Sequence, residues 1–158
     1  MFLSLEYINL LISQLEKLIN VPKVIANIIF GYYLNETIIS TDYAFAALLY
    51  NGRVITWGDV NSGGDSSDVQ AELIGVIAIY STRYAFAALL YNGRVITWGD
   101  TDYGGDSSDV QAELRGVKAI YSTRGSFAAL LYNGRVVTWG DSYKAQDKLK
   151  EIKAIYST

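Results

Sequence analysis

The stretch FAALLYNGRVITWGD, residues 45–59, recurs unchanged at residues 86–100 and with one substitution at residues 127–141. The copies follow one another at a constant spacing of 41 residues. A fixed period of this length is the sequence signature of solenoids and propellers, in which one supersecondary unit is stacked repeatedly. The fold therefore depends on what one copy of this stretch forms.

Each copy predicts a β-hairpin. Two short runs rich in β-branched and aromatic residues flank Asn-Gly, and this dipeptide favours a two-residue type I′ turn in which both residues have positive φ. We predict such turns at residues 51–52, 92–93 and 133–134. A third strand is predicted for each unit at residues 76–80, 117–121 and 152–156, and residues 37–41 take this role ahead of the first hairpin. The nearly continuous apolar runs indicate strands covered on both faces by neighbouring units.

The repeated units are residues 40–80, 81–121 and 122–158. The first two align without gaps and differ at six positions, whereas the third has a shortened loop. Between the hairpin and the third strand, Ser67 with Gln70 and Ser108 with Gln111 fit capping boxes that would open a short helix.

Residues 1–36 carry a different pattern. Apolar residues from Ile8 to Ile19 follow helical spacing, and Pro22 suits the first turn of a second helix. We expect a helical hairpin that caps the repeats of residues 37–158. Ile74 and Ile77 stand where the second copy has Arg115 and Lys118, so we expect the cap to cover these two isoleucines.

The segment from Val117 to Gly140 resembles the repeat of the regulator of chromosome condensation family. It shares with that repeat a small apolar strand, an Ala-Ala-Leu strand, a turn ending in Gly and a strand ending in Trp-Gly. The resemblance extends over about residues 37–158 and implies β-propeller blades used for protein recognition. The expected fold is mainly β, a partial β-propeller of three blade-like repeats with an N-terminal helical hairpin.

A second, shorter resemblance lies in the N-terminal segment. Residues 21–34 are similar to the core of the F-box motif, in which Leu-Pro is followed by Ile-Phe and Tyr-Leu. This resemblance implies an alternative function as a ubiquitin-ligase substrate adaptor.

Composition excludes several classes of chemistry. The chain has no Cys and no His, which excludes Ser-His-Asp and Cys-His catalysis and zinc sites built on either residue. Its net charge of −3 gives no basic footprint for nucleic acid, and no apolar run is long enough to span a membrane. The N-terminus lacks the basic region and cleavage site of a signal peptide. We expect an intracellular protein, cytoplasmic by default, with no nucleic-acid or membrane partner.

Two constellations in the repeats have structural interpretations. The Asp59-x-Asn61-x-Gly63-x-Asp65 series resembles a calcium loop, but Gln70 stands where a bidentate Glu is required. We therefore expect no metal and no cofactor. Trp57, Trp98 and Trp139 are embedded in apolar strands, and we expect them in the core rather than on a ligand-stacking surface.

Near-identical units repeat one surface instead of gathering unlike groups in one place, which favours binding over catalysis. We expect a non-enzymatic protein–protein interaction module, a monomer in preference to a homodimer, whose partner is another protein. Arg residues after each hairpin turn are expected to pair across the strands with Tyr. A carbohydrate-binding repeat protein is a further alternative, which requires exposed Trp or Tyr at equivalent sites. The candidate partner-binding residues are Tyr50, Arg53, Tyr91, Arg94, Asp102, Tyr103, Tyr132 and Arg135.

Overall fold

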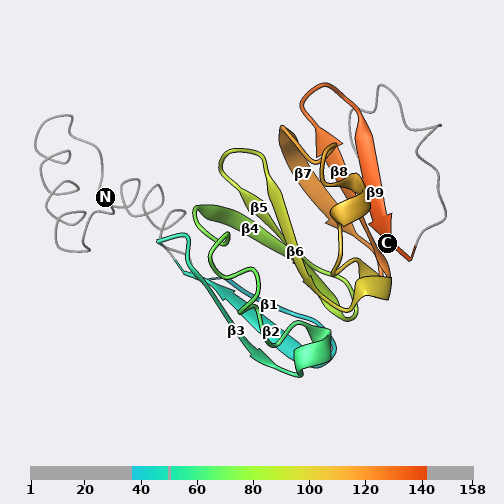
Figure 1. Cartoon of the computed structure of the whole chain (residues 1–158). Helices are drawn as coiled ribbons and strands as arrows, with labels where there is room; N and C mark the ends of the chain where they lie inside the picture. Colours follow the sequence, from blue (N-terminus) through green and yellow to red (C-terminus); the bar gives the residue numbers. More distant parts are fainter. Residues whose placement is uncertain (1–36, 50, 142–158) are drawn as a thin grey trace, which may run out of the picture. The chain divides into compact units, whose positions relative to one another are not determined.

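The computed structural model describes residues 37–49 and 51–141. Within them the chain forms three antiparallel sheets, each of three strands in chain order (Figure 1). The first sheet holds β1 (Thr37–Ser40), β2 (Ala44–Leu48) and β3 (Val54–Gly58), the second β4 (Val76–Ser81), β5 (Ala85–Leu90) and β6 (Val95–Gly99), and the third β7 (Val117–Ser122), β8 (Ser126–Leu131) and β9 (Val136–Gly140). We call these sheets the first, second and third blade. The predicted mainly β fold with three blade-like repeats is confirmed, whereas the helical hairpin in residues 1–36 and the strand at 152–156 lie outside the described residues.

The blades are out of phase with the repeated sequence units. The strand that ends a unit pairs with the hairpin of the next unit, as when β4 runs antiparallel to β5 with Tyr80 opposite Ala87. Repetition alone cannot set this phase, because a periodic sequence has no natural starting point. The backbone hydrogen bonds set it, and each blade therefore joins residues of two units.

The predicted hairpins are present, but their turns are not the expected two-residue loops. In the second blade the N–H of Gly93 donates to the oxygen of Leu90 at 2.9 Å, and the N–H of Leu90 donates to the oxygen of Arg94 at 2.9 Å. This pattern closes a three-residue loop, Tyr91-Asn92-Gly93, with Gly93 at φ +77°. The side chain of Asn92 accepts from the N–H of Arg94 at 3.1 Å, which stabilises this loop.

The blades stack face to face, and the core lies between them. All six residues of β5 are buried, because its alternate side chains enter two different clusters. Phe86 packs with residues of the first blade, including Ala44 and Val54, in one cluster. Ala87 packs with residues of the third blade, including Phe127, in the other. The prediction that neighbouring units cover both faces of a strand is confirmed for this blade.

Each junction between blades is fixed by a tryptophan. The indole Nε1–H of Trp98 donates to the oxygen of Gly63 at 3.0 Å, and that of Trp139 donates to the oxygen of Gly104 at 3.1 Å. These glycines follow the short 3-10 helices η1 (Val60–Ser62) and η2 (Thr101–Tyr103) of the preceding blade. A Cβ at Gly63 would lie 2.6 Å from the ring of Phe86, so the close approach requires glycine.

Among residues 37–49 and 51–141, no blade covers the equivalent face of the first blade. Trp57 is 42% exposed, compared with 5% for Trp98 and 4% for Trp139. The expectation of core tryptophans is therefore right for two positions and wrong for Trp57. Ile74 and Ile77 are 66% and 58% exposed, and the helices expected to cover them lie outside the described residues.

The expected capping boxes are not formed. In the second copy a single turn of 3-10 helix, η3 (Ser108–Val110), begins after Ser107, whose hydroxyl bonds to Gln111 Oε1 at 2.9 Å. Asp106 supplies the acceptor instead, because its Oδ1 accepts from the N–H of Ser108 at 2.8 Å. In the described part of the chain, no helix has the length and apolar character needed to cross a membrane.

Candidate interaction surfaces

The predicted partner-binding residues fall at two opposite ends of the blades. Arg53, Tyr91, Arg94, Tyr132 and Arg135 lie in or beside the β2–β3, β5–β6 and β8–β9 turns, and we call this the turn end. Asp102 and Tyr103 lie in η2, beyond the other end of β6. Five residues of strand separate the two groups, which corresponds to about 17 Å. Tyr50 lies outside the described residues.

The turn end presents exposed tyrosines beside ion pairs. Tyr91 and Tyr132 are each 76% exposed. Arg94 Nη2 donates to Glu72 Oε2 at 2.9 Å, and Arg135 makes the same contact with Glu113. The expected Tyr–Arg pairing across the strands is therefore wrong for Arg94 and Arg135, whereas the pair of Tyr50 with Arg53 includes a residue outside the described ones. The arginines contact carboxylates that lie 22 residues earlier in the chain, in the loop before the blade's first strand.

At the opposite end, which we call the loop end, aromatic rings form a row. The rings of Tyr43 and Tyr84 are parallel, with centroids 5.9 Å apart and an interplanar angle of 6°. Tyr103 meets the ring of Tyr84 edge-on at 4.6 Å. Sequence reasoning found Tyr103 but missed Tyr43 and Tyr84. The available signal was the recurrence of Tyr after Thr-x in the first two copies, with Asp42 exchanged for Arg83 between them.

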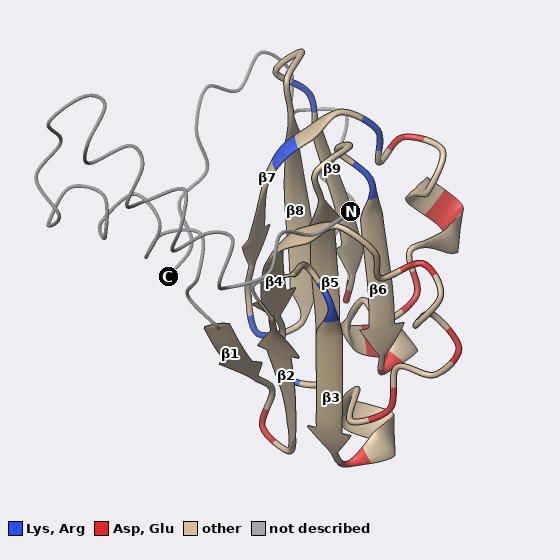
Figure 2. Ribbon diagram, turned by 90° about the vertical axis from the view of Figure 1, so that its left-hand side faces the viewer, with Lys and Arg blue, Asp and Glu red and all other residues tan. Residues whose placement is uncertain are grey.

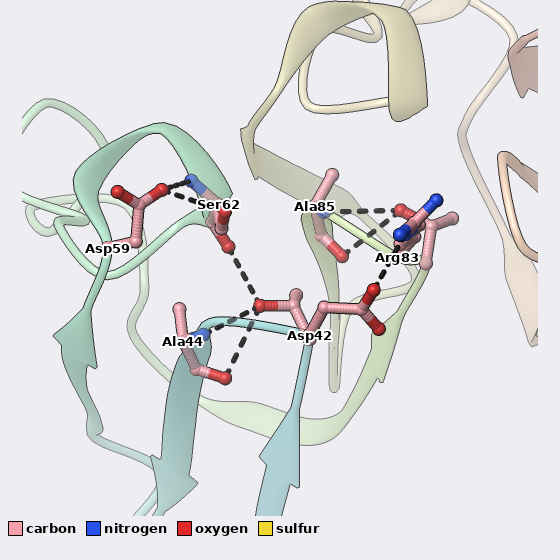
Figure 3. A network of polar contacts seen from close by, with 8 residues as sticks. Asp42, Ala44, Asp59, Ser62, Arg83 and Ala85 are labelled. Atoms are coloured by element: carbon pink, nitrogen blue, oxygen red, sulfur yellow. Dashed lines mark hydrogen bonds and ion pairs between the residues drawn. The ribbon is translucent and has the colours of Figure 1, made fainter.

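That exchange joins the two blades (Figure 3). Arg83 Nε donates to Asp42 Oδ2 at 2.6 Å, and this hydrogen bond raises the pKa of Arg83. The guanidinium also lies over the ring of Tyr84, with Cζ 4.8 Å from the centroid. Nearby, the N–H of Asp42 donates to the oxygen of Arg83 at 2.9 Å. The β1–β2 turn, which contains Asp42, and the β4–β5 turn, which contains Arg83, are thus joined by backbone and side-chain hydrogen bonds.

Asp and Glu residues line the loops that follow β3 and β6 (Figure 2). Asp65 and Asp68, together with Asp100 and Asp102, border a cavity of about 650 Å³ beside these loops. The backbone N–H of Ser67 donates to Asp65 Oδ1, and this bond, followed by that of the Ser67 hydroxyl, lowers the pKa of Asp65. Among the described residues, no three or more acidic side chains gather closely enough to hold a metal ion.

The positions of the tryptophans and of residues 21–34 bear on the two alternative functions. Trp98 and Trp139 are buried, so a sugar-stacking tryptophan ladder is not present in the described blades. Exposed aromatic side chains at equivalent positions are instead found at Tyr91 and Tyr132. The F-box-like segment, residues 21–34, lies outside the described residues.

No family model and no curated protein matches the chain. Solved structures do. Yeast RCC1 (Prp20), in a structure with Kap60, shares 19% identity over 66% of this chain with a TM-score of 0.51. Prp20p from Saccharomyces cerevisiae in a second structure shares 20% identity over 66% of this chain with a TM-score of 0.50.

The chain spans 29% and 30% of the length of these two structures. At this identity the likeness concerns the fold. The described sheets have the fold of RCC1-type β-propeller blades, as the resemblance of the repeat implied.

Proposed function

We propose that the chain is a non-enzymatic protein–protein interaction module that binds a partner protein through its turn end. One observation supports this most strongly. Tyr91 and Tyr132 are equally exposed at equivalent positions of successive blades, each near an Arg–Glu ion pair. Tyr and Arg are the side chains most often found at the centre of protein interfaces, and large exposed aromatic side chains in monomers commonly mark such surfaces.

One tyrosine of the turn end, Tyr91, is also held against its own blade. The backbone N–H of Tyr91 donates to the oxygen of Gly75 at 3.0 Å, and the ring lies against that glycine, whose added Cβ would meet it at 2.6 Å. Arg94 is oriented by Glu72. Side chains already held in one orientation lose less conformational entropy when they bind, so more of the contact energy remains as affinity.

The repetition argues against an enzyme. A catalytic site needs groups with different environments, such as an acid and a base whose pKa values are displaced in opposite directions. Here the same pairs recur one blade apart, as Arg94–Glu72 and Arg135–Glu113 do. The sequence also lacks His and Cys throughout. Repeated identical contacts suit a partner with an extended or repeated surface.

The structural neighbours support a protein as partner. The first is yeast RCC1 (Prp20) in a structure with Kap60, and the second concerns binding of Prp20p to Gsp1p and histones. Those partners belong to those proteins. For this chain they support the class of partner, a protein.

Tyr91→Ala with Tyr132→Ala tests the proposal. The wild-type chain, immobilised and exposed to an extract of the cells that produce it, is expected to retain a partner. The dissociation constant of that purified partner is then measured by calorimetry for each variant. Loss of two interface tyrosines should weaken binding by about 30-fold or more, since truncated hot-spot residues cost about 2 kcal/mol or more.

Val60→Ala, an exposed apolar truncation in η1 at the loop end, is the matched control. Equal affinity of the double variant and the wild type for the partner would refute the proposed surface. Retention of no protein above the level of blank resin would refute the proposed function itself.

A carbohydrate ligand is the second candidate, favoured by the equivalent exposure of Tyr91 and Tyr132. A glycan array separates it from the first candidate. Binding of a glycan that is lost in the double variant would favour this candidate, and an array without signal would remove it.

A further inference from the structure

A pocket of about 400 Å³ opens at the loop end between the first and second blades. Its lining consists of two tyrosines, two aspartates and two small polar residues: Tyr43, Asp59, Asn61, Ser62, Tyr84 and Asp100. The lining thus carries two carboxylates and neither Lys nor Arg. It combines aromatic and acidic side chains, which is the chemistry that receives a cation.

Two tyrosine rings, Tyr43 and Tyr84, form the aromatic part of the pocket lining. Tyr84 packs edge-to-face with Tyr103, and the two ring centroids are 4.6 Å apart. The guanidinium of Arg83 also lies over the Tyr84 ring, with Cζ 4.8 Å from the centroid. Tyr43 stacks parallel to Tyr84 and is 61% exposed. Arg83 is paired with Asp42, and neither of these two residues lines the pocket.

The backbone of each of these aspartates is bonded to the backbone of one tyrosine. The backbone N–H of Asp59 donates to the oxygen of Tyr43 at 2.9 Å, and that of Asp100 donates to the oxygen of Tyr84 at 3.0 Å. Hydrogen bonds from their own loops reach Oδ1 of both aspartates. Within residues 37–49 and 51–141 the bonds found to these carboxylates involve Oδ1, so Oδ2 of each can accept from a ligand.

The next junction shows why the pocket exists here. At the position of Ser62 the second copy has Tyr103, whose ring packs edge-to-face with that of Tyr84. The backbone is the same at both positions, because Thr41 and Thr82 donate their hydroxyls to the oxygens of residues 62 and 103 at 3.1 Å and 2.9 Å. The small Ser62 therefore leaves open, beside Tyr43, the space that a tyrosine ring fills one repeat later.

The third blade lacks the aromatic partner altogether. Gly125 stands at the position of Tyr43 and Tyr84, although its oxygen still accepts from the N–H of Asp141 at 2.9 Å. Four of the six positions that differ between the first two copies lie at this end: 42/83, 60/101, 61/102 and 62/103. The copies thus diverge mainly around the pocket. Along their strands they differ only where Ile77 in β4 is replaced by Lys118 in β7.

We propose that this pocket binds a cationic side chain, Lys or Arg, of a partner protein. The alkyl stem lies against the tyrosine rings, and the charged group donates hydrogen bonds to Asp59 and Asp100. The proposal rests on the proposed function in one respect, namely that the partner is a protein. It concerns the loop end, whereas the proposed function is tested at the turn end.

The probe is N-acetylarginine amide, titrated into the ¹⁵N-labelled full chain and followed by NMR. We expect saturable shifts of the backbone amides of Tyr43, Asp59 and Asp100, and no comparable shift at Asp141. N-acetylnorleucine amide, which has an uncharged side chain, should shift these amides much less. Higher salt should weaken the arginine probe, because the carboxylates are near solvent.

Two variants make the test specific. Asp59→Asn removes one charge but keeps an Oδ1 acceptor for Ser62, and it should weaken the probe about threefold or more. Asp141→Asn, the same change in the blade without the pocket, should leave its affinity unchanged. Ser62→Tyr installs the residue that the second copy already accommodates, and it should abolish the shifts by filling the pocket.

Absence of saturable shifts at Tyr43 and Asp59 would overturn the proposal, as would equal affinity for the norleucine probe or equal effects of Asp59→Asn and Asp141→Asn. These outcomes are separable from failure of the proposed function. The free amino-acid amide reports on the pocket whether or not a partner protein is captured through Tyr91 and Tyr132.

Discussion

Glycine residues decide the path of the chain at several turns of this molecule. Gly93 closes the β5–β6 loop at φ +77°, and Gly116, before β7, has φ +66°. Both positions favour glycine because other residues are strained in this region. The two positions differ in the room available for a side chain. An added Cβ at Gly93 would lie 3.0 Å from Gly116 Cα, whereas an added Cβ at Gly116 would meet no atom within 4 Å.

We predict that Gly93→Val lowers the free energy of unfolding by about 3 kcal/mol, the sum of backbone strain and crowding against Gly116. Gly116→Val carries the strain alone and should cost about 1–2 kcal/mol. Urea denaturation of both variants measures the difference. Equal losses would show that the tight contact between the turn and the segment before β7 is not present.

The sequence predicted a positive φ for glycine in these turns, but it did not predict the length of the loop that contains the glycine. A two-residue loop and a three-residue loop both place Gly93 at positive φ, so Asn-Gly alone does not distinguish them. The strand pattern did not help, because both Leu89 and Leu90 are buried and no alternation marks the register. The loop becomes clear only from the bonds of Leu90 and Asn92.

At the scale of single elements, burial follows from the position of each strand in the stack. β5 is buried along its whole length, but the equivalent β2 is not, and Phe45 is 43% exposed where Phe86 is 0% exposed. The two strands have the same sequence. No analysis of one repeat could therefore separate them, because the difference arises from neighbouring blades.

Trp98→Phe and Trp57→Phe make the same change in these two environments. Loss of the indole N–H at position 98 leaves the oxygen of Gly63 without its buried donor, and we expect a loss of about 2–3 kcal/mol of stability. At the half-exposed Trp57 the expected loss is about 0.5 kcal/mol or less. Thermal and urea unfolding provide the comparison. Equal losses would contradict the assignment of Trp98, rather than Trp57, to a blade junction.

The candidate surfaces were predicted only in part. The sequence identified the exposed tyrosines of the turn end, since hairpin tips are exposed in any stacked arrangement. It assigned the wrong partner to Arg94, because Glu72 lies in a loop whose path depends on the whole blade. It also grouped Asp102 and Tyr103 with the turn end, although β6 separates them from it. The pocket at the loop end depends on residues from two blades and could not be foreseen from one repeat.

For the molecule as a whole, one contact is repeated along the stack. The tryptophans of the second and third blades each donate to a glycine oxygen of the blade before. A Phe ring stacks on the same tryptophan, with centroids 5.2 Å apart in both blades. Because both junctions use the same contacts, successive near-identical blades stack in the same way. The turn ends of the blades therefore lie on one side of the stack and the loop ends on the other.

Hydrogen exchange of the three indole N–H groups tests this stacking most directly. After transfer of the ¹⁵N-labelled wild-type chain to D₂O, the signals of Trp98 and Trp139 should persist, because both groups are buried and hydrogen-bonded. The signal of Trp57, assigned from the spectrum of Trp57→Phe, should be lost first, since this side chain is 42% exposed. Loss of all three signals at one rate, or persistence of Trp57 beyond the other two, would contradict the stacked blades.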